Sequence, residues 1–199
     1  MADRYPDYDV LAKWDSPSFN DKTREILHAR MKLLPRSKHL GEARVATLAR
    51  LVQRVTPQPE GRAPANTLAL VIAKIDADAG DGFRPAGLPR VRAAWQCALD
   101  AINAEAREGH GAAFADISDA QADVLLKALS EGQLHGAAWG NLDARTFWSW
   151  RLIPDLVSAH WAHPSLWSAM GFGGPASPRG YLRQQAGYRD PWEAEWEHA

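Results

Sequence analysis

The sequence predicts an all-α protein, with a single helical domain of about six or seven helices and an extended, irregular C-terminal arm. Apolar residues recur every three or four positions along most of the chain, which is the spacing of one helix face. No stretch alternates apolar and polar residues for long enough to indicate a strand. After Met170 the periodic pattern stops, and glycine and proline become frequent. We therefore expect an N-terminal extended segment (1–17), a helical domain (18–170) and a C-terminal arm (171–199).

The first three predicted helices are bounded by prolines and glycines. The first starts at Ser18, which with Asp21 three residues later resembles a capping box, and its apolar residues continue up to Pro35. The second covers residues 45–55 and stops before two prolines, and the third covers 68–75 and stops near Gly80. Proline and glycine oppose helix continuation, so these boundaries follow from the residue types.

Three more helices are predicted in the second half of the domain. One covers residues 91–106 and ends at glycines 109 and 111. The next starts at a capping box made by Ser118 and Gln121 and is followed by Gly132. The last starts at Asp143 and reaches His163. Pro154 lies inside it, and a proline there removes a backbone hydrogen bond, so we expect a kink.

Composition excludes several classes of protein. A formal net charge of −1 gives no reason to expect a nucleic acid partner, and no apolar run is long enough for a membrane span. A single cysteine, Cys97, excludes an internal disulfide and a cysteine-rich metal site, and it is expected to be a small core residue. The N-terminus lacks the pattern of a secretory signal. We expect a cytoplasmic protein, or a periplasmic one only if it is exported with a signal-bearing partner.

Three short patterns suggest chemistry but fit it poorly. His160 and His163 are one helical turn apart, a spacing that can hold a metal, yet no carboxylate lies at matching spacing; a packing or cap histidine at a helix C-terminus is the alternative. Residues 76–87 begin like a calcium loop but lack its glycine at position six and its final glutamate. Residues 171–176 match a relaxed dinucleotide motif without the strand and helix that it requires. No catalytic residue, bound cofactor or metal ligand is predicted.

The C-terminal arm is the candidate binding site. It has too much glycine and proline for a helix, yet it carries aromatic anchors that disordered segments normally lack. Such a segment needs a surface to rest on, either this domain or a partner. Its arginines could bind an anion, but arginine beside tyrosine and tryptophan is also typical of interface centres, and we prefer the interface. The predicted contact residues are Phe172, Pro175, Arg179, Tyr181, Arg183, Arg189, Asp190 and Trp192.

Both ends of the chain resemble one protein family. The run HPSLWSAMGFGGPASPRGY at residues 163–181, followed by YRDPWEA at 188–194, is similar to the end of the gluconate 2-dehydrogenase subunit 3 family. The opening YPDYDVLAKWDSPSFN at residues 5–20 and the helix that ends at Pro57 also resemble its members.

The resemblance implies a non-catalytic small subunit of an oxidoreductase complex, a heterodimer with a large flavoprotein of the glucose–methanol–choline type. In such complexes the large subunit carries FAD and the catalytic histidines, oxidises a sugar, sugar acid or glycoside, and often passes electrons to a separate cytochrome. Many family members carry a twin-arginine export signal, which is not found here. Two other hypotheses stay open: an independent metal enzyme that uses His160 and His163, and a transient assembly chaperone for the flavoprotein.

Overall fold

The computed structural model describes residues 3–58, 60–175, 180 and 191–195. These residues form helices, turns and irregular segments, and none of them is in a β-strand. The all-α prediction is therefore confirmed. No helix in the described part of the chain has the length and apolar character needed to cross a membrane.

The residues group into two compact units. Unit 1 contains Met1–Leu34, Gln58–Asn66 and His160–Ala199, and unit 2 contains Pro35–Pro57 and Thr67–Ala159. The predicted N-terminal segment and C-terminal arm thus fall in the same unit, together with the first helix. The domain limits expected after residues 17 and 170 stay a prediction.

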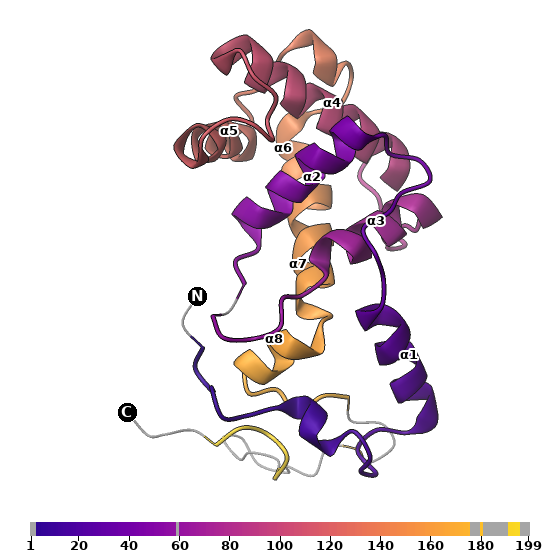
Figure 1. Cartoon of the computed structure of the whole chain (residues 1–199). Helices are drawn as coiled ribbons and strands as arrows, with labels where there is room; N and C mark the ends of the chain where they lie inside the picture. The colour runs from indigo at the N-terminus through magenta and orange to yellow at the C-terminus, as the bar shows by residue number, and fades with distance from the viewer. Residues whose placement is uncertain (1–2, 59, 176–179, 181–190, 196–199) are drawn as a thin grey trace. The chain divides into compact units, whose positions relative to one another are not determined.

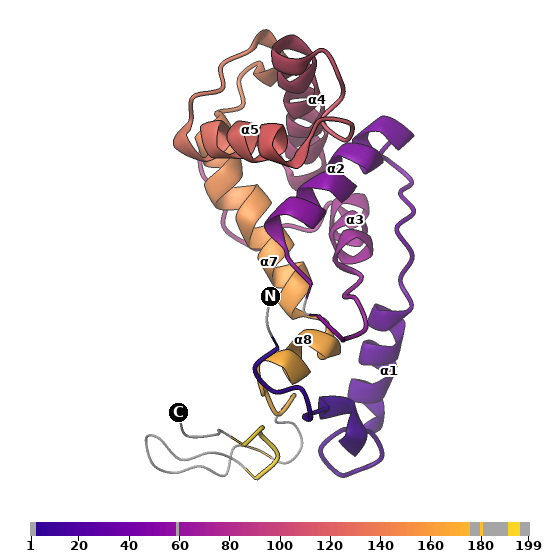
Figure 2. The ribbon, with the colours of Figure 1, turned by 60° about the vertical axis from the view of Figure 1, so that its left-hand side comes forward.

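Unit 2 is built around one long helix, α4 (Val91–His110). It contacts α2 (Glu42–Val55), α3 (Thr67–Ala77) and α5 (Asp119–Glu131), as Figures 1 and 2 show. It also contacts the short helices η2 (Ala137–Trp139) and α6 (Ala144–Phe147). The predicted stripe of α4 is fully buried, including Trp95, Leu99 and Ile102. Burial of this stripe against its neighbours removes apolar surface from water and stabilises the unit.

Local signals fix the ends of these helices as predicted. Ser118 accepts a hydrogen bond from the backbone of Gln121, whose side chain accepts one from the Ser118 backbone, so the capping box of α5 is confirmed. Gly111 (φ 70°) and Gly132 (φ 71°) end α4 and α5 in the left-handed conformation that favours glycine.

The helix predicted from Asp143 to His163 is confirmed only in part. Asp143 caps α6, and a five-residue π-helical turn, η3 (Trp148–Leu152), joins it to α7 (Ile153–Trp161). The turn ends two residues before Pro154. Proline offers no backbone donor to the preceding turn, and a π turn is one way for a helix to absorb that loss. The chain therefore continues past Pro154 in helical form.

Unit 1 contains the short helix η1 (Val10–Lys13), α1 (Asp21–Met31) and α8 (Pro164–Ala169). Val10, Phe19, Leu27 and Trp167 form its core. Two predictions are wrong in this unit, and the first concerns the start of α1. Asn20, and not Ser18, caps α1, with its Oδ1 accepting from the Thr23 N–H over 2.8 Å. Phe19 is buried in this core, so the helix begins after it.

The second error concerns His163. The preceding helix ends at Trp161, and His163 caps the N-terminus of α8 instead of lying at a helix C-terminus. Its backbone is extended (φ −89°, ψ 132°), as is usual before a proline. Pro164 then takes the first helical position, where its missing N–H costs nothing.

Candidate partner-binding site

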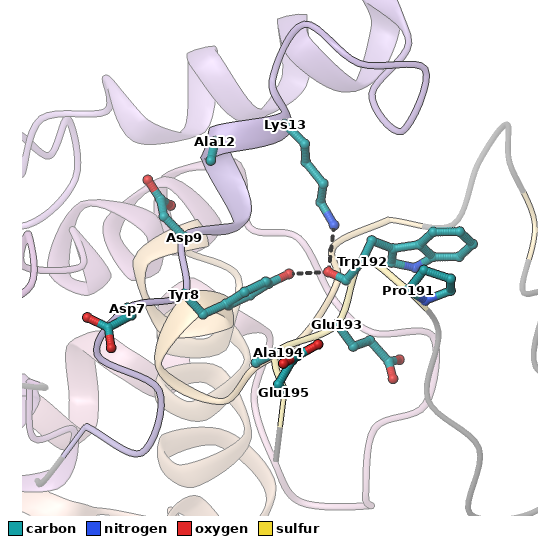
Figure 3. A pocket seen from close by; sticks show the side chains of 10 residues that line it. All are labelled: Asp7, Tyr8, Asp9, Ala12, Lys13, Pro191, Trp192, Glu193, Ala194 and Glu195. Atoms are coloured by element: carbon teal, nitrogen blue, oxygen red, sulfur yellow. Dashed lines mark hydrogen bonds between the residues drawn. The ribbon is translucent and has the colours of Figure 1, made fainter. Parts of the chain in front are cut away.

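The described parts of the C-terminal arm are bonded to the N-terminal segment of the same unit. The Tyr8 hydroxyl donates to the carbonyl of Trp192 over 2.6 Å and lies 3.3 Å from the carbonyl of Phe172. The Lys13 ammonium donates to the carbonyls of Gly173 (2.6 Å) and Trp192 (3.1 Å). Figure 3 shows both side chains converging on the Trp192 carbonyl. Backbone that has no helix or strand partner thus finds its hydrogen bonds at two side chains.

Glycines allow the arm to pack tightly on itself and on the unit 1 core. A Cβ on Gly173 would lie 2.4 Å from Cδ1 of Trp192, closer than real Cβ atoms come. Gly174 has φ +77°, and a Cβ there would meet Phe19 at 3.0 Å. The Ala194 N–H donates to the Gly171 carbonyl over 3.1 Å. The glycine-rich sequence is therefore required by close approach.

Arg62 bonds the segment 58–66 to the N-terminus. Its guanidinium pairs with Asp3, donates to the Tyr5 carbonyl and donates to the Tyr8 carbonyl over 2.9 Å. The hydrogen bond from Arg62 is the main reason why the pKa of Asp3 lies below its usual value. Tyr8 is thus bonded to Arg62 through its carbonyl and to the arm through its hydroxyl.

A shallow pocket of about 440 Å³ lies at this junction (Figure 3). The N-terminal segment lines one side and the arm the other. Four carboxylates and one ammonium line it. The lining residues are Asp7, Tyr8, Asp9, Ala12, Lys13, Pro191, Trp192, Glu193, Ala194 and Glu195.

Three of the predicted interface residues are described. Phe172 is half-buried and packs edge-on against Trp167, with ring centroids 5.8 Å apart. Pro175 and Trp192 are also half-buried. The other predicted residues, Arg179, Tyr181, Arg183, Arg189 and Asp190, lie outside the described residues. That this set contacts a partner stays a prediction.

The two histidines of the metal hypothesis are buried at the junction of α7 and α8. His163 accepts a hydrogen bond from the Ser165 N–H at Nδ1 (3.2 Å), and that nitrogen lies 2.7 Å from the Ser165 hydroxyl. Burial, with smaller contributions from the charges of His160 and Arg30, holds the pKa of His163 below its usual value. No group of three or more potential metal ligands occurs among the residues that the structure places. The observed contact of His163 is that of the N-cap of α8.

Cys97 and the acidic loop after α3 have structural partners. The Cys97 sulfur lies 3.5 Å from the Trp139 carbonyl, and burial raises the pKa of its thiol. Asp76 accepts from Ser37 and the Lys38 N–H, whereas Asp78 pairs with Arg90. The carboxylates of the rejected calcium loop thus bind different partners.

Sequence reasoning missed a buried cluster of charges in unit 2. Asp155 is 1% exposed and lies 2.8 Å from the Lys74 ammonium and 3.5 Å from the Arg151 guanidinium. Arg151 and Lys74 also pair with Asp81, at 3.2 and 2.7 Å. The spacing of Arg151 and Asp155 at i and i+4 on a helix was the available signal. The pairing of Lys74 with Asp155 could not be predicted, since α3 and α7 are far apart in the sequence.

Comparison with known proteins gives a family match. The family model of gluconate 2-dehydrogenase subunit 3 matches residues 42–174, well over half of the chain. No curated protein and no solved structure was found to be similar. A family of dehydrogenase subunits implies that a partner chain exists. This chain belongs to the gluconate 2-dehydrogenase subunit 3 family.

Proposed function

We propose that the chain is a non-catalytic small subunit that binds, stabilises and helps mature a large FAD-dependent dehydrogenase. The partner would be of the glucose–methanol–choline type and would oxidise a sugar or glycoside. Membership of a family of dehydrogenase subunits is the observation that carries the proposal.

The arm supports this role physically. Its backbone is fixed near Tyr8 and Lys13, while Pro191 is exposed and the Trp192 side chain is half-buried. An aromatic side chain on a fixed backbone loses little conformational entropy when a partner covers it. We place the partner contact of the arm on Phe172, Pro175 and Trp192, together with the predicted residues outside the described ranges.

Under this proposal the redox chemistry belongs to the partner. FAD would be bound by the large subunit, and electrons would leave through a separate acceptor such as a cytochrome. The complex would be cytoplasmic, or periplasmic if the partner carries the export signal.

Co-expression tests the proposal. A flavoprotein dehydrogenase of the glucose–methanol–choline type from the same source would be produced with and without this chain, and the soluble yield and flavin-to-protein ratio would be compared. We expect more soluble, flavin-loaded enzyme with the chain present, and co-elution of both chains on size exclusion. Equal yield and flavin content without the chain would contradict the proposal. A rise in yield without co-elution would instead indicate a transient chaperone.

A further inference from the structure

Two large aromatic side chains are exposed next to each other on unit 2. Phe83, in the segment between α3 and α4, is 70% exposed, and Trp150, in the π turn η3, is 51% exposed. Their ring centroids are 5.7 Å apart. Single exposed apolar residues are common, but a contacting pair of exposed aromatics is the kind of feature that marks an interaction surface.

The apolar surface continues along the helix that follows Trp150. Val157, seven residues later, is 40% exposed, and Pro154 between them is half-exposed. Pro154 and Val157 belong to α7, where positions three apart share one side, and Pro154 follows Trp150 by about one helical turn. Phe83, Trp150, Pro154 and Val157 therefore form one surface, which we name the Trp150 face.

An ion pair joins the two segments that carry these aromatics. Arg151, next to Trp150, is directed inward and its side chain is 3% exposed. It pairs over 3.2 Å with Asp81, which lies two residues before Phe83. This ion pair thus connects the loop that carries Phe83 to the turn that carries Trp150. A surface fixed before binding loses less entropy on association than a mobile one.

The residue that follows Phe83 is a positively charged arginine. Arg84 is exposed, and its guanidinium donates to the backbone carbonyl of Leu88. Nearby Arg90 is neutralised by Asp78 at 2.7 Å, but no carboxylate of the described residues pairs with Arg84. Tryptophan and arginine are the residue types most enriched among interface hot spots. The chemistry fits a protein surface with an apolar depression and a carboxylate at its rim.

We propose that the Trp150 face is a docking surface for the large dehydrogenase subunit, and that a partner carboxylate faces Arg84. The inference rests on the proposed function, because it takes that subunit as the occupant. The face lies within the segment that matches the family model, residues 42–174. It provides a contact that does not depend on the arm beyond residue 175.

Binding of purified large subunit to the full chain tests the inference. Phe83→Ser and Trp150→Ser should each weaken binding roughly thirty-fold, the loss expected for a hot-spot aromatic. Val124→Ser is the matched control, since Val124 is 66% exposed on α5, and it should change affinity less than about twofold. Arg84→Glu should weaken binding more at low salt than at high salt, because a charge pair at a rim is screened.

A photocrosslinker provides a readout that does not depend on stability. Phe83→p-benzoylphenylalanine should crosslink to the large subunit in the assembled complex, and the same replacement of Val124 should not. Wild-type affinity of both serine variants, at unchanged melting temperature, would overturn the inference. So would a crosslink from position 83 to a second copy of this chain. If the wild-type chain itself fails to bind the flavoprotein, the proposed function fails as well; if it binds and the aromatic variants bind equally, only the docking surface is wrong.

Discussion

The indole nitrogen of Trp95 donates a hydrogen bond to Oδ2 of Asp155 over 2.7 Å, and both residues are buried. The other oxygen of Asp155 lies 2.8 Å from the Lys74 ammonium. Helices α3, α4 and α7 are thus connected through one carboxylate. A buried charge is tolerated only when it is paired and hydrogen-bonded, so each of these partners contributes to the stability of unit 2.

Removing the indole donor should destabilise unit 2. Trp95→Phe keeps an aromatic ring against Phe147, whose centroid is 5.1 Å away, but leaves Oδ2 of Asp155 without this hydrogen bond. We expect the free energy of unfolding to fall by about 1–3 kcal/mol, measured by urea denaturation. Trp150→Phe, at an exposed position, is the control and should change it by less than about 0.5 kcal/mol. Equal effects of the two variants would show that the hydrogen bond is unimportant.

His163 should make stability pH-dependent. Burial, then the charges of His160 and Arg30, lowers the pKa of His163, so the folded state disfavours its protonation. The stabilisation gained by keeping His163 neutral in the folded state is fully present above the pKa of the unfolded state, near 6.5. It is lost as the pH falls through the lowered pKa of the folded state.

The matching variant is His163→Asn, because asparagine can still cap α8 but does not titrate. The loss of unfolding free energy between pH 7 and pH 5, followed by chemical denaturation, should be smaller in this variant than in wild type. His110→Asn, at an exposed position, is the control and should change the curve less than His163→Asn does. Parallel curves for His163→Asn and wild type would contradict the assignment.

Adding a methyl group at Gly173 should loosen the arm. In Gly173→Ala the new Cβ would lie 2.4 Å from Trp192 Cδ1, so the indole must move. We expect faster hydrogen exchange of the Ala194 amide, which is bonded to Gly171, measured by mass spectrometry of the C-terminal peptides. Gly80→Ala, where nothing lies within 4 Å of the added Cβ, should leave the exchange unchanged. Identical exchange in both variants would mean that the close approach does not fix the arm.

Truncation after Met170 should separate folding from association. Tyr8 and Lys13 of unit 1 donate hydrogen bonds to the arm, whereas the core of unit 2 is formed by α2 to α7. Most of the helical circular dichroism should therefore persist. Binding to the large subunit should fall by roughly a thousand-fold or more if two or more hot spots are removed. Equal co-elution of the truncated chain would contradict the interface assignment of the arm.

Sequence reasoning worked where the signal was local. The capping box of Ser118 and Gln121 and the stop at Gly132 gave α5 correctly, since both act within one helical turn. It failed at Asn20 because two capping residues lay close together, and the burial of Phe19 decided between them. At Pro154 the sequence predicted a kink, and the structure has a π turn just before it.

The contacts that build the site could not be predicted. Tyr8 and Trp192 are 184 residues apart, and no periodic pattern connects them. The same holds for Lys74 and Asp155, whose pairing depends on how α3 packs. The arm was identified as unusual from its composition, but its contact with the N-terminal segment needed the structure.

Isolation of the chain from its native source at natural expression level tests the proposed role most directly. An affinity tag would be placed on the N-terminus, and the eluate would be examined by mass spectrometry, size exclusion and visible absorption. If the chain is a subunit, a flavoprotein dehydrogenase should co-elute with it in constant ratio. The complex should show flavin absorbance, and the chain freed of the large subunit should show none. A chain that elutes alone, or one that retains a flavin spectrum by itself, would contradict that role.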